Sequence, residues 1–207
     1  ALDFIDTLSK DYPDESLLFN IRGACYAGLG QLDIAVQSYK KALSIKPDYA
    51  KAHYNLGGAL QELDKLHDSA KSYENAIALE PENAQAHNNL AIVLRELDQL
   101  EEAEASCRKA IVLDPEYAEA YSSLSIILYA NGDLNSALES IKKAYSINPK
   151  LKIIKLLLAV LKARKTHKTS KVNISNIRSI SNPLILNRAV EQELIANLYE
   201  MKSLELE

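Results

Sequence analysis

The sequence predicts an all-α solenoid, in which antiparallel helical hairpins stack one after another along the chain. The first observation is the spacing of the prolines, which lie 34 residues apart at Pro13, Pro47, Pro81, Pro115, Pro149 and Pro183. A fixed period of this length indicates one supersecondary unit that is copied and stacked. The period accommodates two helices of about a dozen residues with their turns, and the proline ends the second helix because it has no N–H.

The second observation is that small and large residues recur in phase with the prolines. Three positions of the unit are small: Gly23, Gly57, Ala91 and Ser125; Ala35, Ser69, Ala103 and Ala137; Ala42, Ala76, Ala110 and Ala144. One position is bulky and holds Tyr39, Tyr73, Cys107 and Ile141. Small residues let neighbouring helices approach closely, and large ones fill the remaining space. Apolar residues also recur every three or four positions, which is typical of amphipathic helices.

The elements follow in order from this register. Residues 1–15 are expected to be the second helix of a truncated repeat, because Ala1 falls on the small position that opens a second helix. We therefore expect the sequence to begin inside a longer array. Residues 16–151 are expected to form four complete units. Their second helices should open at Leu32, Leu66, Leu100 and Leu134 and close at Ile45, Leu79, Leu113 and Ile147.

The repeat pattern weakens beyond Pro149. Residues 152–182 fit either a degenerate fifth repeat or a basic linker, and 171–181 fits a helix or a loop because Lys171 and Arg178 occupy small positions. Residues 183–207 are expected to contain an amphipathic helix whose apolar stripe is Val190, Leu194, Leu198 and Met201. A stripe of this size should be covered, by the end of the array, by a neighbouring copy in a homodimer, or by a missing domain.

The pattern resembles the tetratricopeptide repeat (TPR) family, whose 34-residue helix–turn–helix carries small and aromatic residues in this order before a closing proline. The clearest copy is AHYNLGGALQELDKLHDSAKSYENAIALEP at 52–81. The resemblance implies that the array forms part of a right-handed superhelix whose first helices line a concave groove. It extends to TPR arrays fused to glycosyltransferases or sulfotransferases, so a substrate-recruiting arm of a larger transferase or oxygenase is the alternative to a free-standing scaffold.

The resemblance also implies that the groove binds a protein or a peptide, in an extended or a helical form. The candidate groove residues are Asn20, Lys51, Tyr54, Asn55, Gln61, Gln85, Asn88, Asn89, Arg95, Ser122, Ser123 and Tyr129. Asn55 and Asn89 occupy equivalent positions, where amides can hydrogen-bond the backbone of an extended peptide. This resembles the asparagine ladder of O-linked N-acetylglucosamine transferases. Asparagines that only solvate the groove explain the pattern equally well.

The carboxylate clamp of chaperone-binding TPR domains is not matched in this sequence. Its first Lys and Asn positions hold Asn20 and Ala24, or Tyr54 and Gly58 one unit later; its later Lys and Arg positions hold Gln85 and Asn89, or Glu119 and Ser123. The resemblance therefore gives no support for binding of chaperone tails.

Catalytic and metal-binding motifs are absent from the sequence. His53 and His87 share one position of the repeat, but that position normally holds an aromatic packing residue, and no third ligand shares their phase. There is no glycine-rich phosphate loop, zinc-spaced Cys/His cluster or nucleophile elbow. Carboxylates are expected on outward helix faces. We predict a non-enzymatic segment without cofactor or metal.

Composition narrows the partners and the compartment. From Lys150 to Val190 there are ten Lys or Arg and no acid, against 24 bases and 28 acids in the whole chain. Such a block can bind nucleic acid, but no aromatic residues interleave with it, and we assign it to capping or solvation. Cys25 and Cys107 are interpreted as packing residues of a reducing, cytoplasmic protein. The chain has no stretch of the length that a membrane span needs.

Overall fold

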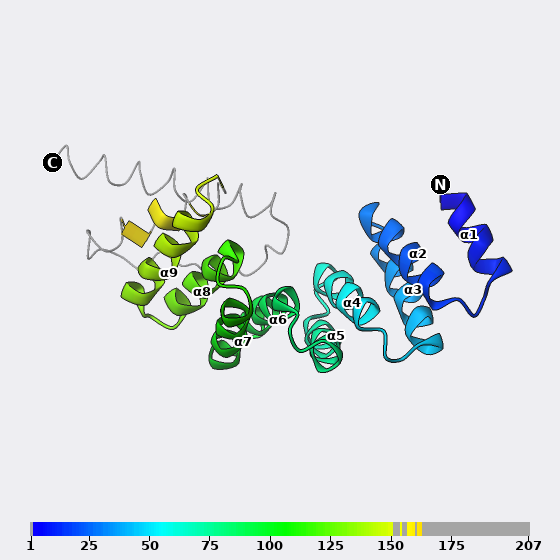
Figure 1. Cartoon of the computed structure of the whole chain (residues 1–207), viewed down its shortest axis with the longest axis horizontal. Coiled ribbons are helices and arrows are strands. Elements are labelled where there is room, and N and C mark those ends of the chain that lie inside the picture. Colours follow the sequence, from blue (N-terminus) through cyan, green and yellow to red (C-terminus); the bar gives the residue numbers. More distant parts are fainter. Residues whose placement is uncertain (1, 151–153, 155–156, 160, 163–207) are drawn as a thin grey trace. The chain divides into compact units, whose positions relative to one another are not determined.

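The computed structural model describes residues 2–150, 154, 157–159 and 161–162, and every element among them is an α-helix (Figure 1). The helices are α1 (Leu2–Asp11), α2 (Ser16–Gly28), α3 (Leu32–Ile45), α4 (Ala50–Glu62), α5 (Leu66–Leu79), α6 (Ala84–Glu96), α7 (Leu100–Leu113), α8 (Ala118–Ala130) and α9 (Leu134–Ile147). The predicted all-α class is confirmed. The chain divides into two compact units, Ala1–Pro115 and Glu116–Glu207.

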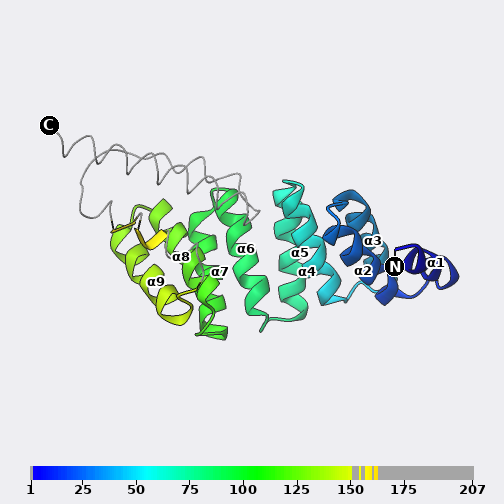
Figure 2. The same ribbon diagram turned by 90° about the horizontal axis from the view of Figure 1, so that it is seen from above.

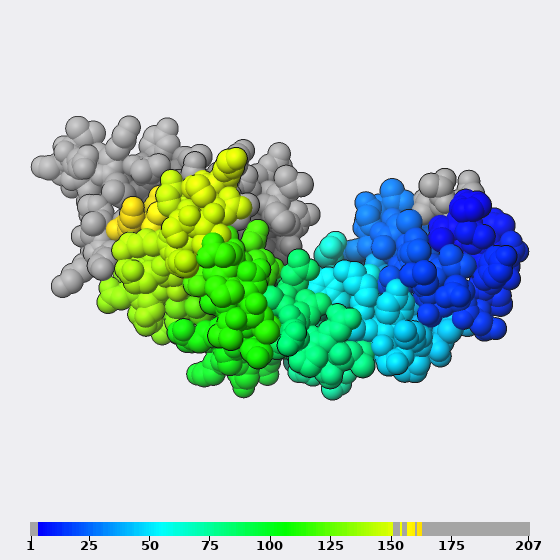
Figure 3. Space-filling model, viewed as in Figure 1, coloured from blue at the N-terminus to red at the C-terminus, as the bar shows by residue number. Residues whose placement is uncertain are grey.

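Helical hairpins are the building blocks of both units. In the first unit, α2 pairs with α3, α4 with α5 and α6 with α7, and in the second unit α8 pairs with α9. Within the first unit the hairpins stack in chain order, because α1 packs against α2, α3 against α4 and α5 against α6 (Figure 2). The space-filling view shows the same succession as a run of colours from blue to green (Figure 3). Each hairpin of the first unit therefore covers the next.

The ends of the helices repeat with the same period. The second helices α3, α5, α7 and α9 stop two residues before Pro47, Pro81, Pro115 and Pro149. The turns inside the hairpins each contain one residue in the left-handed region, namely Gly30, Asp64, Asp98 and Gly132, with φ of 73°, 58°, 64° and 85°. Glycine and aspartate tolerate this conformation better than most residues. The turn chemistry thus accounts for the Gly or Asp found at every copy of this position.

A glycine on a first helix and a tyrosine on the following second helix form close contacts in two hairpins of the first unit. Tyr39 and Tyr73 are buried, and a Cβ placed on Gly23 would lie 2.5 Å from the Tyr39 ring. The corresponding distance from Gly57 to the Tyr73 ring is 2.9 Å. Burial raises the pKa of Tyr39 to about 12. These two hairpins therefore close only because the glycines carry no side chain.

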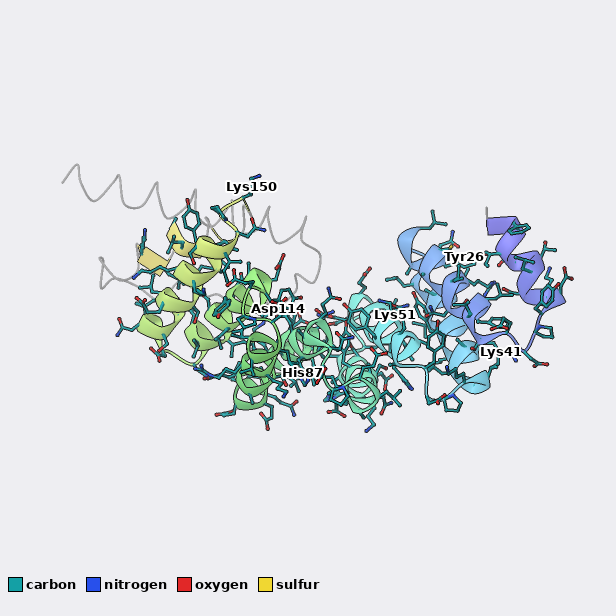
Figure 4. All side chains as sticks on the ribbon, in the orientation of Figure 1. Tyr26, Lys41, Lys51, His87, Asp114 and Lys150 are labelled. Atoms are coloured by element: carbon teal, nitrogen blue, oxygen red, sulfur yellow. The ribbon has the colours of Figure 1, made fainter. Side chains whose placement is uncertain are left out.

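The first helix, α1, is attached by polar contacts where later hairpins use leucine. Arg22 and Tyr26 occupy the positions that hold leucine in the following units, at 56, 60, 90, 94, 124 and 128. Arg22 Nε donates to Asp6 Oδ1 at 2.6 Å, Tyr26 Oη donates to Asp6 Oδ2 at 2.6 Å, and Arg22 Nη1 donates to Ser38 Oγ at 2.7 Å (Tyr26 is labelled in Figure 4). We call Asp6, Arg22, Tyr26 and Ser38 the Asp6 cluster. It holds α1, α2 and α3 together.

Some sequence predictions can be compared with the structure at single residues, and others concern residues that the structure does not describe. Cys107 is buried as expected, but Cys25 is exposed, so its interpretation as a packing residue is wrong for the described chain. Residues 154, 157–159 and 161–162 are helical, and Ile154 and Leu161 are buried. The remainder of 152–182 and all of 183–207 lie outside the described residues, and the cap and the homodimer stay predictions. No described helix has the length and apolar character to cross a membrane.

Candidate peptide-binding surface

The predicted groove residues are distributed over both units. On the first unit they lie on α2, α4 and α6: Asn20; Lys51, Tyr54, Asn55 and Gln61; Gln85, Asn88, Asn89 and Arg95. Ser122, Ser123 and Tyr129 lie on α8 of the second unit, where Ser122 is buried and the other two are half-buried. We call these residues of the first unit, with Leu17, Ile21, Ala24, Gly58 and Ile92 between them, the first-helix face.

Two asparagines connect successive first helices. Asn55 Nδ2 on α4 donates to Asn20 Oδ1 on α2 at 2.9 Å, and Asn89 Nδ2 on α6 donates to the Tyr54 hydroxyl on α4 at 3.0 Å. The two bonds are equivalent, since each joins residues 35 positions apart across one repeat junction. The sequence pattern assigned these amides to a ligand or to solvent. The structure gives them a role between repeats as well.

These bonds change the expected result of replacing the two asparagines with alanine. The sequence alone predicts weaker partner binding with an almost unchanged melting temperature. Because each amide also makes an inter-repeat hydrogen bond, Asn55→Ala and Asn89→Ala should each lower the free energy of unfolding by about 0.5–1.5 kcal/mol. Urea denaturation measures this, with Gln37→Ala on the exposed side of α3 as the control. A double variant as stable as the control would show that the two bonds contribute nothing.

Tyr54 lies on α4, the middle one of the three helices that carry the first-helix face. Its ring lies edge-on to the ring of Tyr73, with centroids 5.7 Å apart, and the Lys51 ammonium lies 4.9 Å from its centroid (Lys51 is labelled in Figure 4). Burial raises the pKa of Tyr54, and the hydrogen bond from Asn89 partly opposes this shift. The ring of Tyr54 is therefore held between Tyr73 and Lys51, and its hydroxyl is held by Asn89.

Two adjacent glycines of α4 have opposite surroundings. Gly57 faces the Tyr73 ring, whereas a Cβ on Gly58 would meet only the Tyr73 hydroxyl, at an ordinary contact distance of 3.6 Å. Gly58 is half-buried and Ala24, its counterpart on α2, is exposed. The face is thus lined by small residues in the middle of α2 and α4, where a ligand side chain would meet little obstruction.

The C-terminal end of α6 carries a largely buried ion pair between Arg95 of this face and Glu96. Arg95 Nη2 lies 3.4 Å from Glu96 Oε1, and the two side chains are 15% and 6% exposed. Burial lowers the pKa of Arg95 and raises the pKa of Glu96, although the attraction of Arg95 and a hydrogen bond from Gln61 partly offset the second shift. Gln61 Oε1 also accepts from the Tyr73 hydroxyl at 3.5 Å. Glu96 is therefore an exception to the general expectation that carboxylates lie on outward helix faces.

The paired histidines lie at the junctions between hairpins. The Nε2 atom of His53 lies 2.9 Å from the Pro47 carbonyl oxygen, and that of His87 lies 3.0 Å from the Pro81 carbonyl oxygen (His87 is labelled in Figure 4). A carbonyl can only accept, so Nε2 is the donor in both rings. Each ring ties the start of a first helix to the proline that closes the preceding hairpin. This contact accounts for histidine at the aromatic position of the repeat.

Sequence models of one repeat family match consecutive parts of the chain. Models described as "TPR repeat" or "Tetratricopeptide repeat" match residues 23–64, 54–118 and 118–151. The matches together run from within α2 to just past the end of α9. They agree with the 34-residue period of the helices and turns.

Curated relatives match over short stretches. A peroxisomal targeting signal receptor of Kluyveromyces lactis is 36% identical over 56 residues, which is 27% of this chain and 10% of that protein. The receptor of the same name from Candida albicans is 44% identical over 45 residues, or 22% of this chain and 8% of that protein. The chain therefore spans about a tenth of the length of the curated relatives it matches.

Solved structures share the fold over longer stretches. A crystal structure of MamA superposes with a TM-score of 0.68 and 25% identity, covering 72% of this chain and 87% of that chain. The first TPR of Spaghetti (RPAP3), solved with the HSP90 peptide SRMEEVD, gives a TM-score of 0.55 at 19% identity, covering 57% of this chain and 94% of that chain. The second likeness shows the fold alone.

Proposed function

Because this chain carries tetratricopeptide repeats across residues 23–151, we propose that it is a non-catalytic scaffold that binds a peptide or helical segment along its first-helix face. Tetratricopeptide repeats mediate protein–protein interactions. The observation that carries the proposal is the position of exposed apolar side chains beside a ladder of fixed amides. Leu17 and Ile21 are 50% and 40% exposed on α2, next to the Asn20–Asn55 hydrogen bond.

This combination suits a peptide for two physical reasons. Apolar side chains of a ligand gain free energy by covering Leu17 and Ile21. The amides of Asn55 and Asn89 are already held by inter-repeat hydrogen bonds, so a ligand that bonds to them loses less side-chain entropy. An amide has two N–H donors and a carbonyl acceptor, and one donor of each serves the inter-repeat bond.

The relatives support a binding role without defining the partner. The K. lactis protein is named as a receptor for a targeting signal, and it matches this chain over 56 residues. The match covers a tenth of that protein, so its targeting role is not carried over. A recruiting role within a larger transferase or oxygenase, a cytoplasmic location and a homodimer stay predictions of the sequence.

The test is a library of random decapeptides, displayed with a free carboxyl terminus and panned against the full chain. Gly58→Leu is the informative variant, because it fills the middle of the first-helix face while its Cβ meets only the Tyr73 hydroxyl. Ala78→Leu, which adds the same side chain to the exposed side of α5, is the matched control. Peptides recovered on the parent chain should bind Gly58→Leu at least about tenfold more weakly and Ala78→Leu unchanged.

Two results would contradict the proposal. One is that no peptide is enriched above the background of an unrelated helical protein. The other is that enriched peptides bind Gly58→Leu as tightly as the parent chain, which would place their site elsewhere on the surface. Circular dichroism of each variant shows whether the fold is retained.

A further inference from the structure

Four side chains at the start of the first unit form an exposed, largely apolar surface. Leu17, Ile21 and Cys25 lie in one row on α2, because they are spaced four residues apart along the helix. All three are exposed. Phe4 lies on α1, which packs against α2, and is 68% exposed. We call these four residues the end face.

The repeat register shows that the end face departs from the rest of the array. The position of Phe4 holds a serine in each of the four complete units. The positions of Leu17 and Ile21 are polar in every later unit. Their counterparts are Ser38, Ser72, Ser106 and Ser140 for Phe4, Lys51, Gln85 and Glu119 for Leu17, and Asn55, Asn89 and Ser123 for Ile21. The first copy of each position is therefore the apolar one.

Two hydrogen bonds of α2 show which neighbour the end face would accommodate. One side chain of α2 donates to Ser38 Oγ on α3, and another accepts from Asn55 Nδ2 on α4. Ser38 and Asn55 are the counterparts of Phe4 and Ile21 one unit later. A single helix placed one unit before α2 would therefore touch Phe4 and Ile21 together.

The packing of the later first helices supports the same position for this neighbour. Helix α4 is packed by both α2 and α3, and α6 by both α4 and α5, whereas α1 is the one described helix on the corresponding side of α2. Cys25 is exposed, but its counterparts Ala59 and Val93 are buried. The end face therefore has the geometry of a repeat junction with one of its two covering helices.

The charges beside the end face indicate the chemistry of a docking helix. Asp11, Asp14 and Glu15 are exposed at the turn between α1 and α2. First helices all run in the same direction, so a helix in this place would begin at the edge that carries the turn. Its N-terminus is the positive end of its dipole, and basic residues before it would add to the attraction. The end face thus fits an apolar helix with a basic N-terminal flank.

We propose that the end face binds residues 183–207 of a second copy of this chain. The sequence of this segment has the features that the end face calls for. Residues 163–182, which precede it, contain five Lys or Arg and no acid. The segment itself carries the apolar stripe of Val190, Leu194, Leu198 and Met201. Docking of an amphipathic helix against apolar helices is a general mode of recognition.

A second copy suits the end face better than two other occupants. Pairing of two end faces would bring the acids Asp11, Asp14 and Glu15 of both copies together, and like charges repel. Docking within one chain would require residues 163–182 to run back past the three stacked hairpins of the first unit. The contact between copies goes beyond the proposed function, which is tested at Gly58 in the middle of the first-helix face.

The experiment measures the mass of the full chain by analytical ultracentrifugation at several concentrations. The face variant combines Phe4→Ser with Ile21→Asn, which are the residue types that the later repeats have at these positions. The stripe variant combines Leu194→Asn with Leu198→Asn. The matched control combines Val112→Ser on α7 with Leu79→Asn on α5, because these residues are 72% and 41% exposed. Circular dichroism checks the fold of each variant.

We expect the parent chain and the control to associate, and the face and stripe variants to associate at least about tenfold more weakly. A mixture of the face variant with the stripe variant should form complexes of two chains, because one supplies an intact segment and the other an intact end face. Added salt should weaken the association, since the basic flank lies beside acids.

Three results would overturn the proposal. A parent chain that stays single, with a lower melting temperature in both variants, would place the segment on its own chain. Association that is lost in the face variant alone would assign the contact to paired end faces. A mixture of the two variants that does not associate would exclude head-to-tail docking. Gly58→Leu should leave the association unchanged, so each of these failures leaves the proposed function standing.

Discussion

Replacing Gly57 with leucine is expected to lower the free energy of unfolding by about 1–3 kcal/mol, because it overpacks a helix contact. The Cβ alone would lie 2.9 Å from two carbons of the Tyr73 ring, and that ring is almost completely buried. Neither α4 nor α5 can retreat without opening its contact with the neighbouring hairpin. Urea denaturation followed by circular dichroism measures the loss.

Gly58→Leu is the matched control for this prediction, because it makes the same change one residue further along α4. The added Cβ meets only the Tyr73 hydroxyl at 3.6 Å, and leucine favours a helix over glycine by up to about 1 kcal/mol. We therefore expect Gly58→Leu to be neutral or stabilising. Equal losses in the two variants would show that the Gly57–Tyr73 contact is not what limits this hairpin.

Replacing Asp6 with alanine is expected to release α1 from the first unit at a cost of about 1–2 kcal/mol. The change removes both short hydrogen bonds to Asp6 and leaves Arg22 facing α1 without its carboxylate. Amide hydrogen exchange measures this locally. Protection should fall in α1 and persist in α4 and α5, because a stacked array transmits stability mainly between neighbours.

The same cluster predicts a dependence on pH. Hydrogen bonds from Tyr26 and Arg22 lower the pKa of Asp6 below its ordinary value of 3.8, and Lys10 adds a smaller effect of the same sign. The stabilisation is therefore complete above about pH 4 and is lost as the pH falls through the lowered pKa. Asp11→Ala, on the exposed end of α1, is the control. Acid release of α1 that persists in Asp6→Ala would assign the effect to another group.

The repeat architecture could be predicted from the sequence because its signals are local and periodic. The prolines, the small positions such as Ala42 and the bulky position of Tyr39 all act within one hairpin or on the next. The period carries these constraints along the chain, so helix ends at 45, 79, 113 and 147 follow from register alone. The helix ends can therefore be predicted from the sequence pattern without knowledge of distant contacts.

The candidate site was less predictable because it depends on geometry between hairpins. The sequence places Asn55 and Asn89 on the right helices, but their partners depend on how α2, α4 and α6 lie against each other. The burial of Glu96 depends in the same way on Gln61, one repeat earlier. The Asp6 cluster did leave a signal, since Arg22 and Tyr26 interrupt two columns that are otherwise leucine.

The spacing of the inter-repeat hydrogen bonds also bears on how the chain folds. Both bonds join residues only 35 positions apart, one repeat plus one residue. The loop that must close before such a contact forms is therefore as long at the start of the first unit as further along it. Loop-closure entropy grows slowly with length, and chains dominated by near contacts fold fast. Nucleation can begin at any complete hairpin of the first unit and spread to its neighbours, so the order of folding follows local sequence and not position along the chain.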